Sequence, residues 1–135
     1  IDDRVCPHAL VDIPAADAAG ADLLVDSVMF KNSGEVWTGQ WVPELMGEAM
    51  TLPTMAPFRR ALKDRVTNLF PDIYYSDWGF YMQCARIGIK PYTGSHIRMV
   101  YTDDLGVGRE SDMSAEKKAW ADDQAHTYAV SLGLL

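Results

Sequence analysis

The segment SDWGFYMQCARIG, residues 76–88, decides the fold. Ser76 is a favourable N-cap residue and Gly88 is a favourable C-terminal stop, so the sequence predicts a helix between them. Apolar residues lie on nearly all sides of that helix, which predicts that it is buried on most sides. The segments IKPY (89–92) and HIRMVYT (96–102) follow it and are predicted to be short strands.

Toward the N-terminus the sequence predicts a helix and a β-hairpin. In PHALVDIPAADAAG (7–20), Pro7 suits the first helical position, Pro14 interrupts the pattern and Gly20 ends it. The apolar run ADLLVDSVMFK (21–31) predicts a strand. The turn residues NSG (32–34) then predict a hairpin in which EVWTGQW (35–41) is the returning strand.

The middle and the end of the chain predict a loop and two helices. Residues 41–57 contain three prolines and a glycine, which indicates a loop with one helical turn. PFRRALKDRVTNLF (57–70) has apolar residues at helical spacing. Residues 111–130 predict a helix capped by Ser111, Asp112 or Ser114, with Trp120 and Tyr128 as its apolar anchors.

Composition limits the class of protein. The chain has 135 residues, of which 48% are apolar and 23% charged, with a formal net charge of -7. These values predict one soluble globular domain and argue against nucleic acid or an anionic membrane surface as partners. The order of the predicted helices and strands indicates an α/β or α+β fold. No apolar run approaches the roughly 18 residues of a membrane span. Cys6 and Cys84 lack CxxC spacing and are interpreted as reduced thiols, which favours a cytoplasmic location.

Three features could carry chemistry. The adjacent carboxylates of Asp2 and Asp3 suit Mg²⁺ or Mn²⁺, or they are a solvated acidic end. Asp77, one residue beyond the predicted N-cap, is either stabilised by the helix dipole or held rigidly as a general base. His96, beside a predicted strand, is either structural or a metal ligand.

Several motifs together resemble family 2-type glycosyltransferases. DDRVCPHAL (2–10) resembles the segment that follows the DxD motif of that family, PFRRALKDRV (57–66) resembles the helix that precedes its acceptor-side motif, and SDWGFYMQCARIGIKPY (76–92) resembles the acceptor-side motif itself. The resemblance covers roughly residues 1–101. It departs from the family at Ser76, where an acidic residue is usual, and at Val66-Thr67, where the family has Val-Gly.

The resemblance implies a fold and an organisation. The fold would be a partial GT-A (nucleotide-diphospho-sugar transferase) fold, an α/β arrangement with a mixed sheet flanked by helices. Residues 1–135 would be a single domain, a fragment that lacks the N-terminal nucleotide-binding half.

The resemblance also implies roles for single residues. Asp3, or Asp2 with Asp3, would hold Mn²⁺ or Mg²⁺ against the donor diphosphate, where the metal assists as a Lewis acid. Asp77 would be the base that deprotonates the acceptor hydroxyl, and His96 would lie near the metal. Arg109, in GVGRES (106–111), would bind donor phosphate.

Residues of the acceptor site are expected in two places. The 41–57 loop would border the acceptor through Trp41, Glu44 and Glu48, and Trp78 would join them from the aromatic start of the predicted helix. The implied activity is the inverting transfer of a sugar from a nucleotide-sugar donor to a glycan or lipid-linked acceptor, with peripheral membrane association left open. The alternatives are a non-catalytic carbohydrate- or protein-binding module and an acidic interaction domain with solvating carboxylates.

Overall fold

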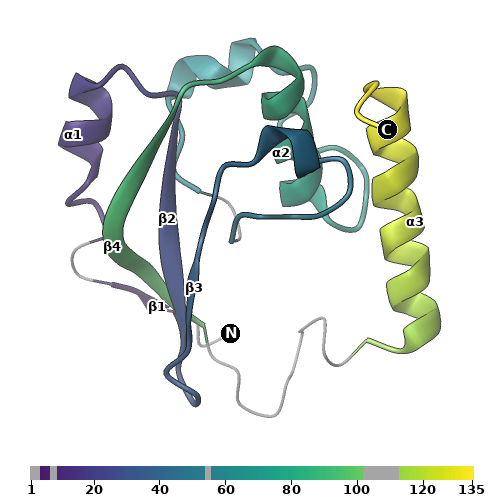
Figure 1. Ribbon diagram of the computed structural model, residues 1–135, viewed down its shortest axis with the longest axis horizontal. Coiled ribbons are helices and arrows are strands. Elements are labelled where there is room, and N and C mark those ends of the chain that lie inside the picture. Colours follow the sequence, from purple (N-terminus) through teal and green to yellow (C-terminus); the bar gives the residue numbers. More distant parts are fainter. Residues whose placement is uncertain (1–3, 7–8, 54–55, 102–112) are drawn as a thin grey trace.

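The computed structural model describes residues 4–6, 9–53, 56–101 and 113–135. The described part is α/β, with a small mixed sheet and flanking helices (Figure 1). Its elements, in chain order, are β1 (Arg4–Val5), α1 (Ile13–Ala18), β2 (Leu23–Phe30), β3 (Val36–Thr38), η1 (Pro43–Leu45), η2 (Arg60–Asp64), α2 (Ser76–Ile87), β4 (Pro91–Tyr101) and α3 (Ala115–Ser131).

The sheet is built around a parallel pair of strands. Its order is β1-β4-β2-β3, with β2 and β4 parallel at the centre and β1 and β3 antiparallel at the edges. The β2–β4 ladder runs from Leu23 opposite Pro91 to Phe30 opposite Tyr101. Its register shifts on both sides of Ser27, so the ladder is irregular next to Asp26.

Helices cover both faces of the sheet, with α1 on one face and α2 on the other. Side chains alternate along β2, so this strand presents apolar residues to both helices. Leu23 and Val25 point into the main core with α2, whereas Leu24 packs with Ala16 on the α1 side. Figure 1 shows the resulting order of layers: α1, then the sheet, then α2, and α3 outermost.

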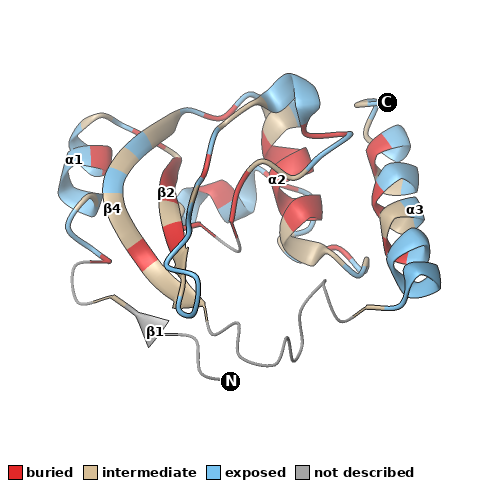
Figure 2. Ribbon diagram, turned by 60° about the horizontal axis from the view of Figure 1, so that its bottom comes forward, coloured by how far each residue is buried: buried red, intermediate tan, exposed pale blue. Residues whose placement is uncertain are grey.

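The core is centred on α2, as its all-round apolar pattern predicts. Phe80, Tyr81, Met82 and Cys84 are completely buried there. Figure 2 shows the buried positions running through α2 and along one side of α3. On α3 these positions are alanines, namely Ala121, Ala125 and Ala129. Their small side chains let α3 pack closely beside the core.

The hairpin prediction is confirmed. β2 and β3 pair antiparallel, with Ser27 opposite Thr38 and Met29 opposite Val36. In the connecting turn, the Gly34 amide donates to the Phe30 carbonyl at 2.8 Å. The loop from residue 41 contains one short helical turn, η1, as expected.

The predicted helix 7–20 is wrong in its extent. Residues 9–12 form turns, and α1 covers only Ile13–Ala18. Pro14 lies in the first turn of α1, so it begins the helix instead of interrupting it. A proline is tolerated there because the first amides of a helix have no partner within it. Pro7 lies outside the described residues.

The predicted helix over residues 57–70 is also wrong, because only the 3₁₀ turn η2 forms there. Neighbouring segments bind the backbone groups that a longer helix would need. The Arg59 amide donates to the Asp22 carbonyl, and the Pro57 carbonyl accepts from the Leu24 amide. At the other end, the Gln83 side chain accepts from the Asn68 amide at 2.9 Å and donates to the Asn68 carbonyl.

Helix ends follow the predicted signals in part. Gly88 ends α2 in the left-handed conformation, with φ of 70°. Ser76, however, is the first helical residue, and Tyr75 is the N-cap without a side-chain bond. Ser114 caps α3 by accepting a hydrogen bond from the Lys117 amide at 3.1 Å. Ser111 and Asp112 lie outside the described residues.

Two further predictions need correction. Residues 91–92 and 96–101 of the two predicted strands belong to one strand, β4, which begins at Pro91, a position where a proline is tolerated. Thr102 lies outside the described residues. Trp120 is exposed and does not anchor α3, whereas Tyr128 packs against the core beside the buried alanines. In the described part of the chain, none of the helices combines the length and the hydropathy of a membrane span.

Candidate functional site

A hollow of about 420 Å³ lies where α2, α3 and the loop after η1 meet. This volume is within the range of small-molecule sites. Two loops and three elements supply its walls, which mix aromatic and charged side chains. Its lining residues are Trp37, Glu48, Ala49, Met50, Tyr75, Asp77, Trp78, Lys118, Asp122 and His126.

Asp77 occupies the first turn of α2, at this hollow. Its Oδ1 accepts a hydrogen bond from the Trp78 amide at 2.9 Å. A carboxylate at such a position lies next to the free amides of the first helical turn and the positive end of the helix dipole. The helix therefore holds a negatively charged oxygen acceptor at the wall of the hollow.

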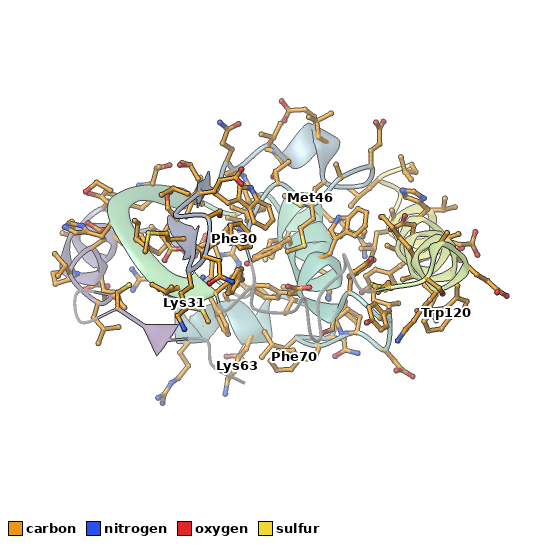
Figure 3. All side chains as sticks on the ribbon, turned by 90° about the horizontal axis from the view of Figure 1, so that it is seen from below. Phe30, Lys31, Met46, Lys63, Phe70 and Trp120 are labelled. Atoms are coloured by element: carbon orange, nitrogen blue, oxygen red, sulfur yellow. The ribbon has the colours of Figure 1, made fainter. Side chains whose placement is uncertain are left out.

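Trp78 is the fixed wall beside Asp77. Its indole Nε1 donates to the Met46 carbonyl at 2.7 Å, which ties α2 to the loop after η1. Its ring lies 5.9 Å from the Tyr75 ring and 6.0 Å from the His126 ring, measured between centroids. Trp78 thus connects α2 with α3 across the hollow. Figure 3 labels Met46 near the centre of the molecule.

Charged groups complete the lining. On α3, Lys118 Nζ lies 3.0 Å from Asp122 Oδ2, an i,i+4 ion pair. Glu48 comes from the loop after η1. Three carboxylates, of Glu48, Asp77 and Asp122, therefore line the hollow together with one ammonium, that of Lys118. This excess of negative charge disfavours an anionic occupant of the hollow.

A second polar cluster lies on the α1 side of the sheet. Asp12 holds the β4 backbone through its Oδ2, which accepts from the Ser95 and His96 amides at 3.2 and 3.3 Å. The His96 ring Nδ1 lies 3.0 Å from the same carboxylate. Partial burial opposes ionisation of Asp12, but the hydrogen bonds and charge of His96 outweigh it and lower the pKa of Asp12.

A buried ion pair lies in the same sheet. Arg98 Nε donates to Asp26 Oδ2 at 2.6 Å, between β4 and β2. Burial raises the pKa of Asp26 above its ordinary value, although Arg98 pulls it the other way. Within the described residues, the second oxygen of Asp26, Oδ1, has no hydrogen-bond partner.

The residues predicted for the site fall into three groups. Asp77, Trp78 and Glu48 line the same hollow. Trp41 instead packs against the core, and Glu44 is exposed on η1. His96 lies beside Asp12 on the α1 side of the sheet, away from the hollow.

Asp2, Asp3 and Arg109 lie outside the described residues. Across the ranges that the structure does describe, His, Cys, Asp and Glu side chains do not gather in a group of three or more that could hold a metal ion.

Sequence reasoning missed several residues of the hollow. The sequence predicts Trp37 only as part of the hairpin. The α3 residues Lys118, Asp122 and His126 follow one another at intervals of four, which is the spacing of one helix face. That spacing was a readable signal for a polar face. The sequence does not indicate that this face of α3 lies next to α2.

Family models, curated proteins and solved structures were all compared with the chain, and none matches it.

Proposed function

We propose that the chain is the acceptor-side part of a GT-A type glycosyltransferase. It would transfer a sugar from a nucleotide-sugar donor to a glycan or lipid-linked acceptor, with inversion at the anomeric carbon. One observation carries the proposal: a carboxylate, Asp77, is held by the start of α2 at a hollow walled by Trp37, Tyr75 and Trp78.

The proposed chemistry assigns Asp77 the role of general base. An acceptor hydroxyl in the hollow gives its proton to the Asp77 carboxylate as its oxygen attacks the anomeric carbon of the donor. The bond from that carbon to the phosphate oxygen breaks, and the nucleoside diphosphate leaves. The rigid first turn of α2 supports this role, because a base must be held within hydrogen-bond reach of the proton that it accepts.

The metal would be held by Asp2 and Asp3. Two adjacent carboxylates are hard oxygen donors, which fit Mn²⁺ or Mg²⁺ in the presence of substrate phosphates. When bound, the ion neutralises charge on the departing diphosphate. Arg109 would add a guanidinium contact to phosphate. His96, whose ring contacts Asp12, is assigned no step in this chemistry.

The test measures sugar transfer on the full-length gene product with Mn²⁺. A panel of uridine, guanosine and thymidine diphosphate sugars is offered together with neutral glycan acceptors. Asp77→Asn is expected to lower kcat by about 10²- to 10⁴-fold, the range that a general base contributes. Asp123→Asn is the matched control, since it removes an exposed carboxylate of α3 that does not line the hollow. It should retain turnover within a few-fold.

Two outcomes would count against the proposal. Full turnover by Asp77→Asn would remove Asp77 from the role of base. Glycan binding that ignores chelation of Mn²⁺, with no turnover of any donor, would favour the alternative of a non-catalytic carbohydrate-binding module.

A further inference from the structure

The hollow beside α2 offers its occupant mostly hydrogen-bond acceptors. Among the described residues, its lining contains the carboxylates of Glu48, Asp77 and Asp122 and the ammonium group of Lys118. An ionised carboxylate only accepts hydrogen bonds, whereas an ammonium group only donates them. An occupant that complements this lining therefore brings hydrogen-bond donors.

Ion pairing cancels only part of the negative charge of the hollow. Lys118 Nζ lies 3.0 Å from Asp122 Oδ2, so the ammonium group of the lining is already paired with a carboxylate. Within the part of the chain that the structure describes, the exposed Glu48 side chain has no hydrogen bond or ion pair. Asp77 accepts a hydrogen bond from the neutral Trp78 amide. The charges of Glu48 and Asp77 therefore remain to attract a cation.

Aromatic side chains supply much of the remaining wall. Trp37 comes from β3, whereas Tyr75 and Trp78 come from the start of α2. The Trp78 indole N–H already donates to the Met46 carbonyl at 2.7 Å, so Trp78 offers an occupant its ring and no donor. The face of an aromatic ring attracts cations through its quadrupole. The rings and the carboxylates thus favour the same kind of occupant, a positively charged group.

The hollow also has the size and the rigidity of a binding site. Its volume of about 420 Å³ is within the range of small-molecule sites. The bond from Trp78 to Met46 fixes one wall, and the bond from the Trp78 amide to Asp77 Oδ1 at 2.9 Å orients a carboxylate. Groups that are held in place before binding lose little conformational entropy when a ligand arrives.

We propose that this hollow binds a protonated amine, and that the preferred acceptor is an amino sugar whose nitrogen is free and positively charged. The ammonium group donates to the Glu48 carboxylate, and the aromatic walls stabilise its charge. Asp77 then stays available for a hydroxyl group of the same sugar. This inference rests on the proposed function and names the preferred acceptor within it, since neutral glycans bind the same hollow more weakly.

The test measures binding to the full-length gene product without any donor, so that it does not depend on turnover. Glucosamine, galactosamine and mannosamine are titrated by isothermal calorimetry at about pH 7, where an amine with the pKa of an α-amino group is mostly protonated. Their N-acetyl forms keep the nitrogen without the charge, and the parent hexoses lack the nitrogen. At least one amino sugar should bind about tenfold more tightly than both neutral forms, and added salt should reduce this preference.

Matched variants separate the charge of the hollow from general damage. Glu48→Gln keeps the shape of the side chain and should remove most of the preference while leaving the binding of the parent hexose unchanged. Glu35→Gln is the control, since it neutralises an exposed carboxylate that does not line the hollow, and it should keep the preference. Trp37→Leu should reduce the preference and Trp37→Phe should restore part of it, with far-UV circular dichroism as the check on folding.

The outcomes distinguish this inference from the proposed function. If an amino sugar is preferred but no donor is turned over, the glycosyltransferase proposal fails and the amine site stands. If sugar is transferred but charged and neutral forms bind equally well, the amine site fails and the glycosyltransferase proposal stands. A preference that is unchanged in Glu48→Gln, or the absence of binding by all three amino sugars, also overturns the amine site.

Discussion

Arg98 and Asp26 join the two central strands through a buried ion pair, with 2.6 Å between Arg98 Nε and Asp26 Oδ2. The Asp26 side chain is 2% exposed and that of Arg98 is 11% exposed. The pair lies where the β2–β4 register shifts, so it connects the strands where the backbone ladder is irregular.

Arg98→Met should therefore destabilise the fold strongly. It leaves the Asp26 carboxylate buried without its guanidinium, which typically costs about 3–5 kcal/mol of unfolding free energy. Urea denaturation at neutral pH measures the loss. Lys118→Met is the control, because it breaks an exposed pair worth about 1 kcal/mol or less. Adding Asp26→Leu to Arg98→Met should recover part of the stability. Equal losses for the two single variants would contradict the buried role of Arg98.

Asp12 should contribute to stability at neutral pH and lose that contribution in acid. The pKa of Asp12 is lowered in the folded state because bonds from His96 outweigh partial desolvation. The contribution is therefore complete above the ordinary value of 3.8 and is lost as the pH falls through the lowered folded value. Asp12→Asn should narrow the difference between urea midpoints at about pH 6 and about pH 3.

Two other aspartates, Asp22 and Asp26, allow the sign of the pH effect predicted for Asp12 to be checked. The pKa of Asp22 is also lowered, since bonds from the Lys90 amide and Arg65 outweigh desolvation, so Asp22→Asn should narrow the same difference. The pKa of Asp26 is raised by burial, so the contribution of Asp26 to the pH dependence of stability has the opposite sign. A wider difference in Asp12→Asn would show that the His96 contact does not stabilise the ionised carboxylate.

Tyr81→Phe should lower the free energy of unfolding by more than the loss of a single hydrogen bond would. The Tyr81 hydroxyl accepts from the Ala56 amide at 2.7 Å and donates to the Pro53 carbonyl at 2.8 Å, all within the core. Phenylalanine leaves both backbone groups buried and unpaired, so we expect a loss of about 2–4 kcal/mol. Tyr128→Phe is the control, since the Tyr128 hydroxyl makes no hydrogen bond within the described residues. A loss as small as that of Tyr128→Phe would contradict the bridging role.

Gly79→Ala should destabilise α2 although alanine is the better helix former. A Cβ at residue 79 would overlap the Pro71 ring and lie 3.0 Å from Ile73 Cδ1. Overpacking of this kind costs about 1–3 kcal/mol, against a gain of about 1 kcal/mol in helix propensity. The reverse change on the exposed side of α3, Ala119→Gly, should cost about 1 kcal/mol. Chemical denaturation compares them, and a stabilised Gly79→Ala would refute the close packing.

Local signals predicted the elements whose partners are near in sequence. The β2–β3 hairpin follows from its turn at residues 32–34, and the ends of α2 and α3 follow from Gly88 and Ser114. The segment 57–70 could not be predicted in this way. Its helical pattern is overridden by bonds from Gln83 and from the backbone beside β2, which only the tertiary fold supplies.

The candidate site was predictable on one side only. Asp77 at a helix start and Trp78 beside it are local features of the sequence. The opposite wall comes from α3, and the position of α3 depends on the fit of Ala125 and Ala129 against the core. No sequence pattern near Asp77 indicates which helix will face it.

The parallel pairing of β2 with β4 has a consequence for the order of folding. Leu23 pairs with Pro91, so the central ladder can form only when the chain closes a loop that contains residues 31–90. During synthesis β2 emerges long before β4. Until β4 has been made, the side chains that β2 buries in the folded protein, Leu23 and Val25 among them, have no central strand to pack beside. Late closure of the sheet predicts slow folding of this small chain and makes the nascent β2–β3 hairpin its segment most exposed to misassociation.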